Sequence, residues 1–265
     1  PDNGSAMAHR KSASGLLRGE TERKTALVVL NRPLSRWTKR LWWNAELRVL
    51  ADGAANRIYD GPEEVSMRSK SEKEAREEVM PDAIVGDLDS IREDVKLYYQ
   101  QRNVLVSDQS EDQDSTDLMK SLKFVQDEME KKGCGTNEYT VAVLGAFGGR
   151  LDHVLGHLNL LYQYQDMDLV LLDNCSLAML IRGGKTTIDI DEECEGPTCG
   201  LIPLGGGETR ATTTGLIWNL DKDTHVLQIG GLISSCNKID GKVVTVDADG
   251  PLLWTSELRG DDHCD

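Results

Sequence analysis

The chain has 265 residues and a formal net charge of −15, because 30 lysines and arginines stand against 45 aspartates and glutamates. This balance argues against a protein that coats nucleic acid, which needs a basic face, and no apolar run reaches the roughly 20 residues of a membrane span. We therefore expect a globular protein of one large or two smaller domains, with neither nucleic acid nor membrane as a partner.

The chain opens with a polar, basic tail, residues 1–24, which we expect to be disordered and to begin with an expression-vector remnant. Short apolar runs then predict strands at 25–31, 47–51, 82–85, 104–106, 139–144 and 168–172. Helical spacing between them predicts helices at 35–45, 92–102, 115–132 and 151–164. This alternation predicts an α/β domain over 25–175, with a mostly parallel sheet and helices on both faces.

Two segments depart from this alternation. Residues 62–80 are highly charged with little apolar content, which is typical of an exposed helix or loop insertion. Beyond 176 the helical patterns vanish, and an all-β sandwich is predicted over 176–258, followed by a tail at 259–265. Its strands are expected at 186–190, 200–204, 209–213, 216–220, 225–229 and 243–246.

Six scattered cysteines form no CxxC pair, and their density is far below that of a disulfide-stapled secreted domain. We therefore expect free thiols and a cytoplasmic protein.

Carboxylates follow four successive predicted strands of the α/β domain. In open parallel sheets the ligand lies beyond the carboxyl ends of the strands, so these side chains should meet at one edge. Glycines beside them would let a ligand approach the backbone. The carboxylates are Asp52, Asp87, Asp89, Asp112, Asp114, Asp117 and Asp152.

Oxygen ligands without a nearby cysteine favour Mg²⁺, which commonly binds one or two carboxylates together with substrate phosphates. Arg150 offers a positive charge to a phosphate, and the predicted helix starts at Ser115 and Leu151 offer backbone amides. The alternative reading is structural, since Asp and Gly are ordinary turn residues and Asp, Ser and Asn are ordinary helix caps. Four such loops in register at strand ends favour function over that alternative.

These four loops, and further motifs in the β region, resemble those of the thiamine pyrophosphokinases, with a pattern nearest to the animal enzymes. The resemblance runs from about Thr25 to Leu258, with its motifs in order. The matching segments are ADGAANRIYD (51–60), PDAIVGDLDSI (81–91), DQDSTDLMKSL (112–122), LGAFGGRLDHVLGHLNLL (144–161), CGLIPLG (199–205), TTTGLIWNL (212–220) and VVTVDADGPLLWT (243–255).

The resemblance implies that ATP and thiamine give AMP and thiamine diphosphate with Mg²⁺, in a homodimer whose active sites lie at the subunit interface. It implies that Asp87, Asp89 and Asp114 hold the metal, and that with Arg150 and Asp152 they form the catalytic set. ATP would be bound by Asp52, Gln113, Asp117, Arg150 and Asp152. Thiamine would be bound by Trp218, stacked from the partner subunit, and by Ser235 and Asn237.

The residues agree with this chemistry, because diphosphate transfer needs alignment and charge neutralisation more than covalent catalysis. A tryptophan face also attracts a cationic thiazolium ring, although a core tryptophan in a sheet is the alternative for Trp218. The identity of a general base stays open among Asp114, Asp117 and Asp152. His153 and Phe147 depart from the family pattern and receive no role.

Two other functions compete with this one. The acidic loops alone do not exclude a metal-dependent phosphohydrolase acting on a nucleotide or phosphate ester, in which water replaces thiamine. A non-catalytic nucleotide or thiamine sensor is the third hypothesis, against which the presence of all four acidic loops argues.

Overall fold

The computed structural model describes residues 9–20, 23–68, 71–205 and 207–259. They form two units, one from within residues 21–174 and the other from residues 9–20 together with 175–259. The predicted vector remnant at 1–8 and most of the predicted C-terminal tail lie outside the described residues. In the part of the chain that is described, no helix has the length and apolar character needed to cross a membrane.

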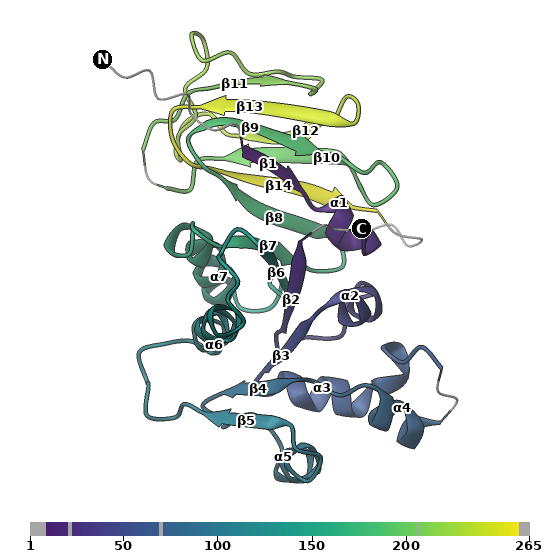
Figure 1. The fold of residues 1–265 in the computed structure, drawn as a ribbon. Helices are drawn as coiled ribbons and strands as arrows, with labels where there is room; N and C mark the ends of the chain where they lie inside the picture. The colour runs from purple at the N-terminus through teal and green to yellow at the C-terminus, as the bar shows by residue number, and fades with distance from the viewer. Residues whose placement is uncertain (1–8, 21–22, 69–70, 206, 260–265) are drawn as a thin grey trace. The chain divides into compact units, whose positions relative to one another are not determined.

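The first unit is built on a six-stranded, fully parallel sheet in the order β7-β6-β2-β3-β4-β5 (Figure 1). Its central strands are β-branched or apolar and buried on both faces, as a parallel sheet between helical layers requires. The strands are β2 (Lys24–Val29), β3 (Leu47–Ala51), β4 (Ala83–Gly86), β5 (Leu105–Asp108), β6 (Tyr139–Leu144) and β7 (Asp168–Leu172).

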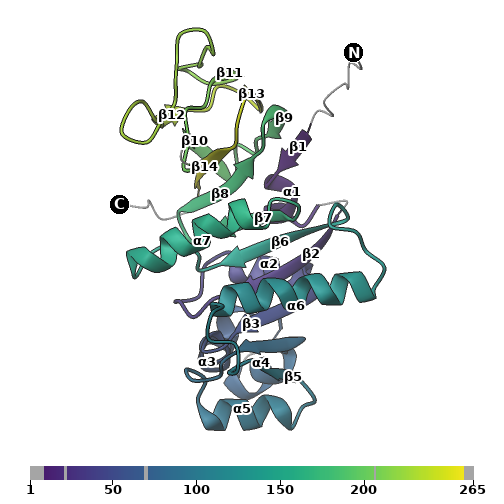
Figure 2. The ribbon, with the colours of Figure 1, turned by 90° about the vertical axis from the view of Figure 1, so that its left-hand side faces the viewer.

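Helices cover both faces of this sheet, with α6 and α7 on one side and α2 and α3 on the other (Figure 2). The helical elements are α2 (Thr38–Asn44), α3 (Ala54–Asp60), the 3-10 turn η1 (Pro62–Glu64), α4 (Glu72–Glu78), α5 (Glu93–Gln100), α6 (Asp117–Lys131) and α7 (Leu151–Gln163). In α6, Leu118, Leu122, Val125 and Met129 form one buried stripe, and the Thr116 hydroxyl caps its start.

The second unit is rich in strands. One sheet has the order β1-β9-β13-β11, and the strands β12, β10, β14 and β8 pair antiparallel in that order. Its elements are β1 (His9–Ser12), α1 (Ser14–Arg18), β8 (Ser176–Ile181), β9 (Gly184–Asp189), β10 (Glu195–Ile202), β11 (Ala211–Thr214), β12 (Ser234–Lys238), β13 (Val243–Ala248) and β14 (Leu252–Leu258). The predicted fold class, an α/β unit followed by a β-rich one, is confirmed.

The structure corrects several predictions. Residues 9–20, expected to be disordered, contain β1 and α1, because β1 completes an edge of the sheet beside β9. Residues 216–220 and 225–229 form turns with isolated bridges rather than strands. The sequence reading missed β8, β12 and β14, and it missed α3, which begins directly after Asp52-Gly53.

The cysteines divide into two groups. Cys134, Cys194, Cys199 and Cys236 are free thiols, as expected. Cys175 is disulfide-bonded, so the expectation of free thiols is wrong at that position.

Candidate active site

A cavity of about 760 Å³ opens at the carboxyl edge of the parallel sheet. It is lined by residues that follow β2, β4 and β6, by the first turn of α6 and by one side of α7 along its length. In the sheet, β2 lies beside β3 on one side and beside β6 on the other, so the strand order reverses there. Ligands of open α/β sheets bind at such a reversal, which makes this cavity the candidate active site.

Three carboxylates meet at this edge. Oxygen atoms of Asp52, Asp87 and Asp117 all lie within 4.8 Å of one another. Asp52 is fixed in place, because the Ser90 amide donates to its Oδ2 at 2.9 Å and the Ile91 amide donates to its Oδ1 at 3.1 Å. The three residues come from the ends of β3 and β4 and the start of α6, so the sheet itself brings them together. We call them the acidic trio.

Gly86, the last residue of β4, sets the spacing of the acidic trio. A Cβ atom at this position would lie 2.7 Å from Cβ of Asp52 and 2.9 Å from Oδ1 of Asp117. Both distances are shorter than real contacts allow, so only glycine lets β4 pass between these two side chains.

Burial and neighbouring charge raise the pKa of two members of the acidic trio. Burial raises the pKa of Asp52 above its usual value, and the charge of Asp87 adds to the rise while the Ser90 and Ile91 amides oppose it. Burial likewise raises the pKa of Asp117, with further contributions from the charges of Asp87 and Asp52. Carboxylates that repel one another in this way favour a cation between them.

Asp89, Asp112 and Asp114 lie in exposed loops beside the cavity. Asp89 accepts a hydrogen bond from the hydroxyl of Ser90 at 2.7 Å. Asp112 accepts from the amides of Asp114 and Ser115, and its pKa is lowered chiefly by the Ser115 side chain and further by these two amides. Gln113 donates its side-chain amide to the Ser110 carbonyl at 2.6 Å. Asp89 and Asp114, two of the three predicted metal ligands, therefore lie outside the acidic trio, whereas Asp87 belongs to it.

Arg150 and Asp152 lie at the start of α7 and line the cavity. They pair with each other, since Arg150 donates from Nη2 to Oδ2 of Asp152 at 2.5 Å and from Nε to Oδ1 at 3.1 Å. Both side chains are exposed, so the pair stays accessible to an incoming anion. His153 also lines the cavity, whereas Phe147 is half-buried in the preceding loop.

Asn31, Arg32 and His157 are polar cavity residues that the sequence did not predict. Asn31 and Arg32 follow β2, and His157 lies on α7 with its Nδ1 donating to the Ala146 carbonyl at 2.8 Å. Burial lowers the pKa of His157, which keeps it neutral near pH 7. Asn31 ends the first predicted strand and Arg32 follows it. The carboxyl end of that strand meets the same edge as the acids, so both residues could have been predicted there.

A second cavity, of about 360 Å³, lies in the β-rich unit. It is lined by Trp218, Asn219, Leu220, His225, Leu232, Ser234, Ser235, Cys236 and Asn237. Trp218 is 57% exposed and lies in a turn, so the alternative of a core tryptophan in a sheet is wrong. The three residues predicted to bind thiamine are thus gathered at one cavity.

Two asparagines hold the Trp218 turn. Buried Asn237 accepts from the Trp218 amide at 3.3 Å and donates Nδ2 to the Trp218 carbonyl at 2.8 Å. Asn219 donates to the Leu216 carbonyl at 2.8 Å and accepts from the Leu216 amide at 3.2 Å. Asn237 therefore positions Trp218. Among the three residues predicted to bind thiamine, Ser235 and Trp218 are exposed and Asn237 is buried.

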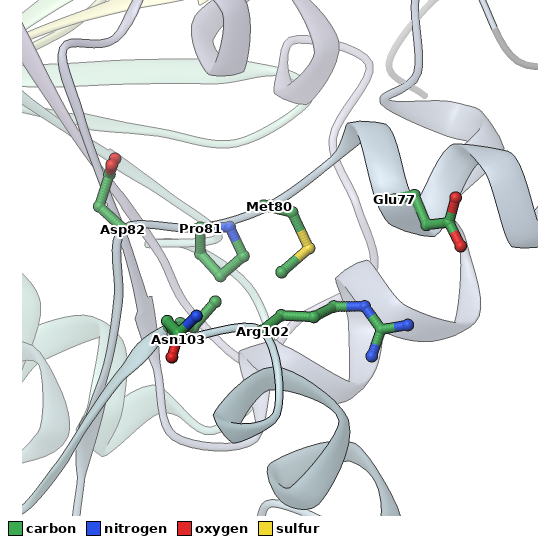
Figure 3. A pocket seen from close by; sticks show the side chains of 7 residues that line it. Glu77, Met80, Pro81, Asp82, Arg102 and Asn103 are labelled. Atoms are coloured by element: carbon green, nitrogen blue, oxygen red, sulfur yellow. The ribbon is translucent and has the colours of Figure 1, made fainter.

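A third cavity, of about 440 Å³, lies at the opposite edge of the parallel sheet. Figure 3 shows Met80 and Pro81 on the segment entering β4 and Arg102 and Asn103 on the segment entering β5. These residues precede the strands, away from the carboxyl ends where ligands of this architecture bind. This cavity is therefore not part of the candidate active site.

Family models match both units. The model described as thiamin pyrophosphokinase, catalytic domain, matches residues 38–171, and the one described as its vitamin B1 binding domain matches residues 185–253. Among solved structures, yeast thiamin pyrophosphokinase has a TM-score of 0.81 at 23% identity, covering 98% of this chain and 95% of that one. The enzyme from Candida albicans also gives 0.81, at 24% identity, covering 95% and 93%. These two likenesses concern the fold.

Curated relatives carry the same name. Thiamine pyrophosphokinase 1 of Oryza sativa is 43% identical over 235 residues, which cover 88% of this chain and 87% of that one. Thiamine pyrophosphokinase 1 of Arabidopsis thaliana is 41% identical, covering 90% of this chain and 88% of that one. Thiamin pyrophosphokinase 1 of Caenorhabditis elegans is 30% identical, covering 85% of each chain. These relatives do not support the expectation of a chain nearest to the animal enzymes. With such identity over most of its length, the chain belongs to the thiamine pyrophosphokinase family.

Proposed function

We propose that this protein transfers the diphosphate of ATP to the hydroxyl of thiamine. The observation that carries the proposal is that the family relationship extends over both units, the one with the acidic cavity and the one with the Trp218 cavity. The thiamine oxygen attacks the β-phosphorus, the bond from that phosphorus to the oxygen bridging it to the α-phosphorus breaks, and AMP leaves with that oxygen. The hydroxyl proton passes to a carboxylate or to water.

The acidic trio is the place where the chain would hold a divalent cation, which we propose to be Mg²⁺. Its donors are all carboxylate oxygens, the type that a hard cation prefers, and their mutual repulsion falls when a cation lies between them. When bound, the cation supplies charge neutralisation on the phosphate oxygens. Asp87 belongs both to the trio and to the ligand set predicted with Asp89 and Asp114, so it is the metal ligand that both assignments share.

The nucleotide phosphates would lie between the acidic trio and the start of α7. Arg150, paired with Asp152 at the helix start, can turn from its carboxylate to a phosphate, because both side chains are exposed. Asp117, in the first turn of α6, lines the same cavity. Gln113 lies in the loop just before this helix, next to the cavity. The backbone amides that begin α6 and α7 add favourable dipoles for an anion.

Thiamine would be bound by the Trp218 cavity. The exposed indole offers a face to a cationic aromatic ring, and Asn237 fixes the backbone that carries it. Ser235 offers a hydroxyl at the rim. A hydrogen-bonded turn of this kind keeps the aromatic ring in place before the ligand arrives.

A homodimer with shared sites is part of the proposal. Large apolar side chains are exposed on the first turns of α7, where Leu151 is 71% exposed, and around the Trp218 turn, where Ile217 is half exposed. Exposed apolar side chains of this size are typical of surfaces that associate. In this arrangement Trp218 would serve the active site of the partner.

A cytoplasmic location remains a prediction. The free thiols Cys134, Cys194, Cys199 and Cys236 support it, whereas the disulfide at Cys175 does not.

The test is to incubate the protein with ATP, Mg²⁺ and thiamine and to identify the products by mass. AMP and thiamine diphosphate are expected only when all three are present. Thiamine monophosphate together with ADP would contradict diphosphate transfer. Release of phosphate or diphosphate without thiamine would instead favour the phosphohydrolase, which the family relationship disfavours.

A further inference from the structure

Arg32 is the cavity residue whose role neither the acidic loops nor the family motifs explain. It follows β2, its side chain is half-buried, and it lines the same cavity as the start of α7. Among the described residues, no carboxylate pairs with its guanidinium and no side-chain hydrogen bond involves it. A guanidinium that lines a cavity without a carboxylate partner is free to donate its hydrogen bonds to an anion that enters the cavity.

The glycine-rich loop after β6 is shaped around this side chain. A Cβ at Gly149 would lie 2.6 Å from Nη1 of Arg32, and one at Gly148 would lie 3.0 Å from Nη2. At Gly145 a Cβ would lie 3.0 Å from Cβ of Arg32. All three glycines also have a positive φ, between 74° and 81°. The loop therefore has no side chains where the arginine lies against it, and it keeps the guanidinium at the cavity.

The backbone of Arg32 is also fixed. Its amide donates to the Leu30 carbonyl at 2.7 Å, and the Leu30 amide donates to the Leu144 carbonyl at 3.0 Å. Pro33 follows and restricts the backbone of Arg32 to extended conformations. The position of this guanidinium is thus set by the ends of β2 and β6.

The other basic groups of the cavity differ from Arg32. Arg150 is already paired with Asp152 and is exposed. His157 donates to the Ala146 carbonyl, and burial lowers its pKa, so it carries no charge near neutral pH. Within the described lining, Arg32 is the permanent cation that has no carboxylate partner, in a cavity that also contains Asp87, Asp117 and Asp152.

We infer that Arg32 binds the polyphosphate chain of ATP through its guanidinium. A planar guanidinium donates two parallel hydrogen bonds to phosphate oxygens, which fixes the orientation of the phosphate as well as its position. The inference rests on the proposed diphosphate transfer, and it gives the cavity a fixed positive side facing the acidic trio. Phosphates would then be held between Arg32 and the cation bound by the trio.

Steady-state kinetics of Arg32→Gln, Arg32→Lys and the control Arg102→Gln test this inference. Arg102 lies at the opposite edge of the same sheet, outside the cavity. We expect Arg32→Gln to raise the KM for ATP about 10- to 100-fold, with kcat and the KM for thiamine changed by less than about threefold. Arg32→Lys should recover part of the loss, because the charge returns without the planar fork. A KM for ATP that stays within about twofold of the parent in folded Arg32→Gln would overturn the inference.

A second measurement uses the unaltered protein, so it does not depend on the folding of a variant or on turnover. Phenylglyoxal modifies accessible arginines, and peptide masses report the rate at each one. ATP with Mg²⁺ should slow the modification of Arg32 and leave that of Arg102 unchanged. Equal rates at Arg32 with and without ATP would overturn the inference, even if thiamine diphosphate is made. Protection of Arg32 in a protein that makes no thiamine diphosphate would support the inference while the proposed function fails.

Discussion

Each unit of the molecule buries one carboxylate to the same extent, but the two lie in different surroundings. Asp52 in the α/β unit and Glu195 in the β-rich unit are both 1% exposed. Asp52 accepts two backbone amides and lies beside two further carboxylates at the edge of a cavity. Glu195 accepts the Ser256 hydroxyl at 2.9 Å, and burial raises its pKa to about 7.

The difference teaches how to distinguish a buried acid that binds a ligand from one that belongs to the core. Backbone amides favour the ionised form of Asp52, and its carboxylate neighbours create a demand for a cation. At Glu195 burial outweighs the hydrogen bonds from the Ser256 hydroxyl and the Asp191 backbone, so the protein holds this carboxyl protonated until near neutral pH. Burial alone is the same in both, and the donors and neighbours around the carboxylate decide its role.

Changing each of these acids to its amide should affect kcat very differently. The largest loss of kcat is expected at Asp52. Asp52→Asn removes one of the three charges that hold the cation, so kcat should fall about 1000-fold, which corresponds to about 4 kcal/mol of lost transition-state stabilisation. The measurement is AMP formation at saturating ATP and thiamine. Glu195→Gln is the matched control, and its kcat should stay within about twofold of the parent. Equal losses in both variants would contradict the distinction.

The same assay decides between the two metal-ligand assignments. Asp87→Asn should be as damaging as Asp52→Asn, because Asp87 belongs to both sets. If Asp89→Asn and Asp114→Asn retain more activity than Asp117→Asn, the acidic trio is the ligand set. The opposite order would favour the ligands implied by the family motifs and would mean that their loops move when ATP binds.

Glu195 should make folding stability depend on pH. Unfolded, this carboxyl loses its proton near pH 4.5, whereas in the folded protein it keeps the proton until about pH 7. Its contribution is therefore fully present below pH 4.5 and is lost as the pH rises towards 7, a change of about 3 kcal/mol. Relative to the parent, Glu195→Gln should gain this amount between about pH 4.5 and pH 8 in urea unfolding. The exposed Glu192→Gln is the control, and parallel curves for parent and Glu195→Gln would contradict the assignment.

Gly86→Ala tests whether the spacing of the acidic trio matters more than its charge. The new methyl group would collide with Asp52 and Asp117, so kcat should fall about 100-fold. The free energy of unfolding should fall by about 1–3 kcal/mol from overpacking. Gly135→Ala is a suitable control, because a Cβ there would have its nearest neighbour at 3.9 Å. Full activity of Gly86→Ala would show that the trio tolerates a shift.

The smallest effect is expected in the second cavity. Trp218→Ala should raise the KM for thiamine about 10-fold, through loss of a cation–π contact, and should leave the KM for ATP unchanged. Its stability should stay near that of the parent, because the side chain is mostly exposed. Ile229→Ala, at an exposed position outside the cavity lining, is the control. An unchanged KM for thiamine would remove Trp218 from the site.

The α/β unit was largely predictable from sequence because its strands are continuous apolar runs. β3, β6 and β7 begin and end at the predicted residues, and their ends are marked because Asp52, Gly145 or Asp173 directly follows each run. The edge that gathers Asp52, Asp87 and Asp117 followed from the same reasoning. Which of seven carboxylates meet could not be predicted, because this depends on the approach of α6 and on the absence of a side chain at Gly86.

The β-rich unit was less predictable because its strand pairing is non-local. The apolar pattern at 216–220 predicts a strand, yet Asn219 and Asn237 hold a turn there. Asn237 lies far from Trp218 in sequence, so no local pattern reveals this contact. β1 was missed for the same reason, since its polar residues gain their partner only from β9.

The pairing of β1 with β9 has a consequence for the order in which the protein takes shape during synthesis. Residues 9–20 leave the ribosome before the α/β unit does, but β9 follows more than 160 residues later, and the ion pair between Arg10 and Asp189 must wait for it. The contiguous α/β unit can meanwhile form from local strand–helix contacts. The β-rich unit is completed only when its C-terminal strands emerge. Its contacts therefore span longer stretches of sequence, and this unit should fold more slowly than the α/β unit.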